Sequence, residues 1–139
     1  MSTSPQVVAE IERIVLSEID IDEKDDNEET PLHKAAETGE ENTLRALIEL
    51  GANIEAKDTF DETPLRKAAE NGKENTFRAL IELGANIDVQ DSDGLAILHI
   101  VATRRRKENI LRELIELGAN IEVKDNDGLT PLHLSLIHI

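Results

Sequence analysis

The segment Thr30-Pro31-Leu32-His33-Lys34-Ala35-Ala36 decides the fold, because the chain repeats it at a fixed distance. It returns as Thr63-Pro64-Leu65-Arg66-Lys67-Ala68-Ala69 and, in weaker form, as Ala96-Ile97-Leu98-His99-Ile100-Val101-Ala102. Thr130-Pro131-Leu132-His133 follows, so the steps are 33, 33 and 34 residues. A second marker, Leu-Gly-Ala-Asn-Ile, keeps the same period at 50–54, 83–87 and 117–121. Two independent markers with one period predict a protein built from stacked repeats.

Each copy predicts two short helices and a turn. A threonine at the N-cap accepts a hydrogen bond from a free helix amide, and the proline after it needs no partner. Gly39 and Gly72 are expected to end the first helix of their copies. The second helix, at about 42–50, places leucines and isoleucines on one face, and Gly51 ends it in a left-handed conformation. A turn rich in Asp, Thr and Gly follows.

This pattern closely resembles the ankyrin repeat, and the resemblance covers residues 18–133. The resemblance implies an all-α solenoid, a curved stack of antiparallel helix pairs from which β-turn fingers project. Residues 5–29 align with the second half of a repeat, since Ile14-Val15 meets Leu47-Ile48. Such a terminal cap is expected to have a polar outer face, because nothing stacks on it. The predicted units are a capping half repeat at 1–29, repeats at 30–62, 63–95 and 96–129, and a truncated fourth repeat at 130–139.

The last six residues, Leu134-Ser135-Leu136-Ile137-His138-Ile139, do not continue the repeat pattern. A leucine stands at position 136, where the pattern has alanine and where the extra bulk would overpack the helix contact. The same six residues are encoded by a widely used sequencing adapter in one reading frame. Our hypothesis is that this tail is not native and that the gene continues. A stop codon directly after Ile139 in the intact gene would contradict it.

The net charge of −15 is graded along the chain. It is −8 over residues 1–29, −5 over 30–62, −2 over 63–95 and zero over 96–129. Such acidity argues against nucleic acid as a ligand and permits a basic protein partner, although it also serves solubility. The sequence contains no cysteine and no stretch of about 20 apolar residues, and residues 1–6 do not resemble the start of a signal peptide. We expect an intracellular, cytoplasmic monomer that does not bind membranes.

No catalytic or metal-binding pattern emerges. His33, His99 and His133 occupy one motif position in different copies, so stacking separates neighbours by about 10 Å, far more than a zinc site allows. The segment Asp20-Ile21-Asp22-Glu23-Lys24-Asp25 fails as a calcium loop because a lysine holds a ligand position and the required glycine is missing. The sequence therefore predicts no metal, no cofactor and no enzyme activity.

Three departures from the family pattern bear on the joints between repeats. Arg66 stands where the family has a histidine that ties neighbouring loops together, which puts that joint in doubt. Glu28 and Asp61 replace the finger glycine, and Glu tolerates a positive φ less well, so a looser first finger is expected. In repeat three, the segment 104–107 is Arg-Arg-Arg-Lys. It is either a solvated turn or a basic patch for an acidic ligand or the acidic arm of another copy.

The candidate binding residues come from comparing the first two full repeats. They are identical at 22 of 33 positions, and seven of the 11 differences fall in the fingers, at 55–62 against 88–95. Either the finger sequences vary freely because they are exposed turns, or the finger residues contact the partner, as the resemblance implies. Phe60, whose copies are all polar, is either an exposed hot spot or folds back on a neighbouring finger. The predicted partner-binding residues are Asn27, Glu29, Thr59, Phe60, Glu62, Glu70, Asn71, Asp93, Leu95 and Arg104.

The leading interpretation is a scaffold or adaptor that binds a partner protein through its finger tips and concave inner-helix surface. The alternative is the recognition portion of a longer multidomain protein, such as an enzyme that uses repeats to choose substrates. A purely structural repeat protein ranks third. A catalytic domain in the full-length gene would decide for the alternative.

Overall fold

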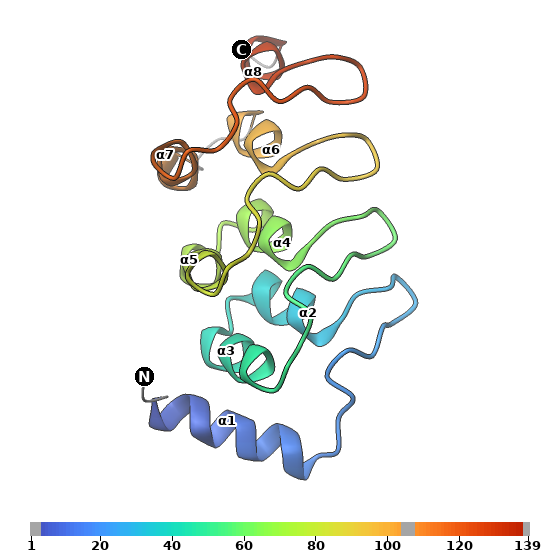
Figure 1. Cartoon of the computed structure of the whole chain (residues 1–139), viewed down its shortest axis with the longest axis vertical. Coiled ribbons are helices and arrows are strands. Elements are labelled where there is room, and N and C mark those ends of the chain that lie inside the picture. Colours follow the sequence, from blue (N-terminus) through green and yellow to red (C-terminus); the bar gives the residue numbers. More distant parts are fainter. Residues whose placement is uncertain (1–3, 104–107, 138–139) are drawn as a thin grey trace.

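The computed structural model describes residues 4–103 and 108–137, which form a stack of helix pairs (Figure 1). One column holds α2 (Pro31–Thr38), α4 (Pro64–Glu70), α6 (Ile97–Thr103) and α8 (Pro131–Ile137). The second column holds α3 (Glu41–Glu49), α5 (Glu74–Glu82) and α7 (Glu108–Glu116), and α1 (Pro5–Leu16) lies across its N-terminal end. The prediction of an all-helical solenoid is confirmed over the described residues.

The first column is the inner column of the stack and the second is the outer column. The inner helices begin where the sequence predicts. The Thr30 and Thr63 hydroxyls each accept a hydrogen bond from the backbone amide three residues on, at 3.4 Å, and proline follows at the first helical position. Gly39 ends α2 with a φ of 79°, a left-handed conformation that a residue with a Cβ adopts only with strain. The short connection to α3 turns the chain back on itself, so the two helices pack as a pair.

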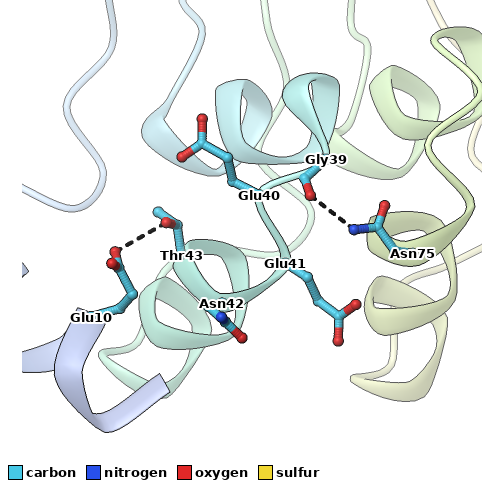
Figure 2. A pocket seen from close by; sticks show the side chains of 7 residues that line it. All are labelled: Glu10, Gly39, Glu40, Glu41, Asn42, Thr43 and Asn75. Atoms are coloured by element: carbon cyan, nitrogen blue, oxygen red, sulfur yellow. Dashed lines mark hydrogen bonds between the residues drawn. The ribbon is translucent and has the colours of Figure 1, made fainter. Parts of the chain in front are cut away.

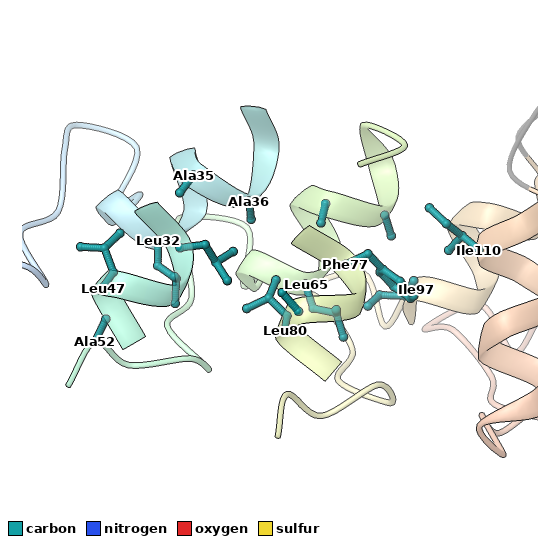
Figure 3. Close-up of a cluster of buried hydrophobic side chains, with 14 of the residues drawn as sticks. Leu32, Ala35, Ala36, Leu47, Ala52, Leu65, Phe77, Leu80, Ile97 and Ile110 are labelled. Atoms are coloured by element: carbon teal, nitrogen blue, oxygen red, sulfur yellow. The ribbon is translucent and has the colours of Figure 1, made fainter. Parts of the chain in front are cut away.

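A continuous apolar core runs through the stack between the two columns (Figure 3). Small residues on the inner helices, such as Ala36 and Ala69, are fully buried and let successive inner helices approach closely. The larger side chains fill the space between the columns, and none is more than 2% exposed: Leu32, Leu44, Leu47, Leu65, Phe77, Leu80, Ile97, Ile110 and Leu114. Burial of these side chains is the main driving force for the stack.

Four projecting loops, the fingers, are formed by residues 20–29, 53–62, 86–95 and 120–129. One aspartate side chain holds each finger tip by hydrogen bonds to the backbone. In the second finger, Asp58 Oδ1 accepts hydrogen bonds of 2.9 Å from the amides of Phe60 and Glu62. Neighbouring fingers are joined through the backbone, because the Thr59 amide donates to the Asn27 carbonyl at 3.1 Å. Equivalent bonds join the other fingers, so the tips form one edge of the molecule.

We expect Glu28→Gly to stabilise the protein by about 0.5–1 kcal/mol. Glu28 has a φ of 60° at the finger position where Gly94 and Gly128 have 78° and 79°. A glycine there removes the strain of the Cβ in a left-handed conformation. The measurement is the free energy of unfolding in urea. Glu28→Ala is the control, since it removes the same charge but keeps the Cβ, and an equal gain in both variants would show that the strain is unimportant.

The first helix departs from the predicted polar cap. α1 packs on α3 and buries Val7 and Ile14, as a cap should. Its other side exposes apolar residues, among them Val15 at 56% and Leu16 at 83%. The prediction of a polar outer face is therefore wrong in part, because its acidic residues lie mainly in the finger that follows. Among the described residues, no helix is long and apolar enough to cross a membrane.

Candidate binding surface

The fingers carry almost all of the net charge. Together the four segments hold seventeen acidic residues and three lysines, which accounts for −14 of the net −15. The helices, the connections and the termini are close to neutral as a group. Because the fingers lie side by side along one edge, this edge presents a strongly negative surface (Figure 1).

Lys67, on α4, is the centre of an ion-pair cluster that spans two fingers. Its Nζ lies 3.1 Å from Glu29, 3.2 Å from Asp58 and 3.0 Å from Glu62, and its side chain is 15% exposed. Glu29 closes the first finger, whereas Asp58 and Glu62 belong to the second. One ammonium group therefore neutralises carboxylates that would otherwise repel one another at short range.

Arg66, also on α4, links the second finger to the third. Its Nη1 lies 2.6 Å from Asp91 Oδ2 in the third finger, and its other nitrogens lie 3.2 Å from Glu62 and 3.4 Å from Glu70. In the neighbouring pairs, His33 and His99 reach the next finger by hydrogen bonds of 2.8 and 2.9 Å to backbone carbonyls. The joint that the sequence left in doubt is thus made by an ion pair in place of a histidine hydrogen bond.

A second substitution explains why an arginine stands at position 66. Lys34 pairs with Asp25 at 3.2 Å, and Lys67 pairs with Asp58 at the same distance, so in the first two fingers a lysine nine residues after the aspartate supplies its cation. The equivalent position in the third copy is Ile100. Asp91 receives its cation from Arg66 of the preceding pair. This exchange can be recognised in the sequence only when positions 66 and 100 are compared together.

We expect Arg66→His to destabilise the fold alone but much less in combination with Ile100→Lys. The single change restores the histidine joint and leaves Asp91 without its cation, whereas the double change rebuilds the arrangement seen around Asp58. A favourable coupling of about 1 kcal/mol or more is expected in a double-mutant cycle of urea unfolding. Additive effects of the two changes would contradict this account.

The cluster also shifts the pKa of its members. Burial raises the pKa of Asp58, but the amides of Glu62 and Phe60 and the ammonium of Lys67 outweigh it, so the pKa lies below its usual value. Burial lowers the pKa of Lys67, but hydrogen bonds to Glu62, Glu29 and Asp58 outweigh it and hold the pKa above its usual value. Both groups are therefore charged in the folded protein near neutral pH.

Stability is expected to fall on acidification. A carboxylate with a depressed pKa in the folded state stabilises the fold above its unfolded pKa of about 3.9. That contribution is lost as the pH falls through the folded value, because protonation of Asp58 ends its pairing with Lys67. Urea unfolding near pH 7 and near pH 3 measures the loss. Asp58→Asn serves as the control, and an equal loss in this variant would mean that Asp58 is not responsible.

Four of the predicted binding residues lie at the finger tips. Asn27, Phe60 and Asp93 hold the same place in successive fingers, and the carbonyl of each accepts an amide from the next finger. Thr59 also donates its hydroxyl to the Asn27 carbonyl at 2.8 Å. The Phe60 side chain is 61% exposed, so it does not fold back to bury itself on a neighbouring finger.

The other predicted residues are less available. Glu29, Glu62 and Glu70 are held in the ion pairs of Lys67 and Arg66, because opposite charges lie within 3.4 Å of them, so they are not free acids for a partner. Asn71 is the C-cap of α4 and donates to the Lys67 carbonyl, and Leu95 is half-buried. Arg104 and the basic patch lie outside the described residues.

A polar hollow of about 520 Å³ lies beside the connection between α2 and α3 (Figure 2). Glu10 accepts a hydrogen bond from Thr43 at 3.0 Å, and the Asn75 amide donates to the Gly39 carbonyl at 2.8 Å. Its lining holds the carboxylates of Glu10, Glu40 and Glu41, two asparagine amides and the Thr43 hydroxyl. Over the part of the chain that the structure describes, no group of three His, Cys, Asp or Glu residues is arranged to hold a metal ion.

The chain stacks similar helix pairs on a shared core, and a finger projects from each repeat. These features define a helical repeat protein of the solenoid class. A family model described as ankyrin repeats, in three copies, matches residues 8–91 and 83–138. The chain belongs to the ankyrin-repeat family. Ankyrin repeats are generally protein–protein interaction modules. No curated protein was found to match the chain.

Proposed function

We propose that this chain is a scaffold or adaptor that binds a basic segment of a partner protein along the edge of its fingers. The observation that carries the proposal is Phe60, a large apolar side chain 61% exposed at a tip whose flanks are acidic. Aromatic residues surrounded by polar groups dominate the binding energy of many protein interfaces. A partner would place a lysine- or arginine-rich surface against the acidic edge and an apolar side chain against Phe60.

We restrict the proposed site to exposed residues of the finger tips. Asn27, Thr59, Phe60 and Asp93 lie on one edge, and the backbone bonds between fingers fix their spacing. A preformed surface loses little conformational entropy on binding. Glu29, Glu62 and Glu70 support this edge from behind through Lys67 and Arg66. We further propose that the chain contributes recognition and no catalysis, since its buried histidines are engaged in joints between fingers.

The test is a comparison of Phe60→Ala/Asp93→Lys with the unchanged chain as bait for cellular proteins. Both residues are exposed, so the fold is expected to persist, and circular dichroism checks it. Proteins that bind the unchanged chain are expected to be lost from the variant and to be released from the unchanged chain by added salt. Equal recovery by both baits would contradict the proposed edge.

The matched control carries the same kinds of change on the outer column. Leu83→Ala/Glu49→Lys removes an apolar side chain 39% exposed and reverses one exposed charge. This variant is expected to recover the same proteins as the unchanged chain. A loss as large as that of the finger variant would mean that net charge, not the finger edge, governs binding.

A further inference from the structure

The connection between α4 and α5 contains the one Asn-Gly pair of the sequence, Asn71-Gly72. The chain has nine asparagines, and six of the other eight are followed by isoleucine or threonine. A side chain branched at Cβ crowds its own backbone nitrogen, whereas glycine has no side chain. The backbone nitrogen after Asn71 is therefore less shielded by a side chain than the nitrogen after any other asparagine.

The fold restrains this pair but leaves it exposed to solvent. The Asn71 side-chain amide donates a hydrogen bond of 2.8 Å to the Lys67 carbonyl, and the Gly72 amide donates one of 3.2 Å to the Ala69 carbonyl. Asn71 has a ψ of 2°, which turns the Gly72 nitrogen away from the Asn71 side chain. An attack of that nitrogen on the side chain therefore requires the last turn of α4 to open.

We propose that Asn71 is a site of spontaneous deamidation, and that opening of the last turn of α4 sets its rate. In the open turn, the Gly72 nitrogen loses its proton to hydroxide and forms a bond to Cγ of Asn71. The bond from Cγ to the side-chain nitrogen breaks, and that nitrogen takes a proton from water and leaves as ammonia. Water then opens the succinimide ring at either of its carbonyl carbons, which gives aspartate or isoaspartate at position 71.

Either product weakens the end of α4. Aspartate lacks the N–H that bonds the Lys67 carbonyl, and it adds a negative charge at the negative end of the helix dipole, directly after Glu70. Isoaspartate carries the backbone through the side chain, and the added methylene group displaces the turn to α5. Because Arg66 and Lys67 on the same short helix link three successive fingers, modification of Asn71 is expected to loosen these links.

The preceding repeat contains the same turn without a reactive amide. Thr38 holds the position of Asn71, and its hydroxyl donates to the Lys34 carbonyl at 2.9 Å, as the Asn71 amide does within its own helix. Gly39 follows with a φ of 79°, against 69° at Gly72. Asn71→Thr is therefore a matched control, because it keeps a bond to the helix and removes the amide that leaves. The proposal is independent of the proposed finger-edge function.

The experiment incubates the unchanged chain in mildly alkaline buffer, both folded and unfolded in urea, and follows position 71 by peptide mapping with mass spectrometry. Asn71 is expected to convert in the folded chain, at least about tenfold more slowly than in urea. Urea below the unfolding transition is expected to speed the conversion, because it favours local opening. Asn71→Thr is expected to keep its thermal midpoint on ageing. Asn71→Asp, one of the two products, is expected to unfold at a temperature about 3–5 °C lower.

Several results would overturn the proposal. Equal rates in the folded chain and in urea would mean that the turn does not restrain Asn71. A rate that follows only the globally unfolded fraction would mean that the last turn of α4 does not open by itself. Conversion of the asparagines before isoleucine or threonine at the same rate would mean that Gly72 is not the cause. Equal thermal midpoints for Asn71→Asp and Asn71→Thr would mean that the product does not loosen α4.

Discussion

Phe77→Ala is expected to destabilise the protein by about 3–5 kcal/mol, the cost of emptying a well-packed aromatic site. Phe77 is fully buried on α5, at the middle of the stack, in the apolar core that also holds Leu65 of α4 and Ile97 of α6 (Figure 3). A loss at the centre also weakens the interfaces to the pairs on both sides, because a solenoid is stabilised by contacts between neighbours. Urea unfolding followed by circular dichroism measures the change.

Phe60→Ala is the matched control, because it makes the same chemical change at a side chain that is 61% exposed. Its expected effect on the free energy of unfolding is about 0.5 kcal/mol or less. The two phenylalanines of the chain thus separate a core role from a surface role. Similar losses in both variants would mean that Phe60 packs against its neighbours and is not free to meet a partner.

Lys67→Met is expected to destabilise the protein by about 2–3 kcal/mol, because it leaves charges without their partner in a largely buried place. Glu29, Asp58 and Glu62 would face one another without the ammonium group that lies within 3.2 Å of all three. The methionine keeps the length and apolar contacts of the lysine stem. The loss is expected to be largest near neutral pH and smaller in acid, where the carboxylates are neutral in any case.

Lys34→Met is the control at the equivalent position one repeat earlier. Lys34 pairs with Asp25 at 3.2 Å, but its side chain is 57% exposed, and an exposed pair contributes about 0–1 kcal/mol. A large difference between the two lysine variants is therefore expected. If both cost the same small amount, the cluster around Lys67 does not hold the fingers together.

The fold followed from the sequence because repetition multiplies weak local signals. One threonine–proline pair predicts a helix start with little certainty, but the pair at Thr30, Thr63 and Thr130 with a constant period leaves few alternatives. The buried leucines, the finger aspartates and the N-caps are then the same feature seen in several copies. Local preference and overall architecture agree at most positions of these copies, which is the condition for a predictable fold.

The features that sequence reasoning missed depend on contacts between different repeats of the chain. Arg66 looked like a lost joint because one position was compared at a time, and its partner Asp91 lies 25 residues away in the next finger. Glu29 and Glu62 looked like free acids for a partner because sequence alone does not show that Lys67 reaches both. The apolar side of α1 was missed because the acidity of the segment as a whole concealed Val15 and Leu16.

The most direct test of the proposed binding edge is amide hydrogen exchange of the chain with and without a captured partner. We expect the partner to slow exchange in the finger segments 53–62 and 86–95, around Phe60 and Asp93, and to leave exchange in α3 and α5 unchanged. Slowed exchange confined to the outer helices, with the finger amides unaffected, would contradict it.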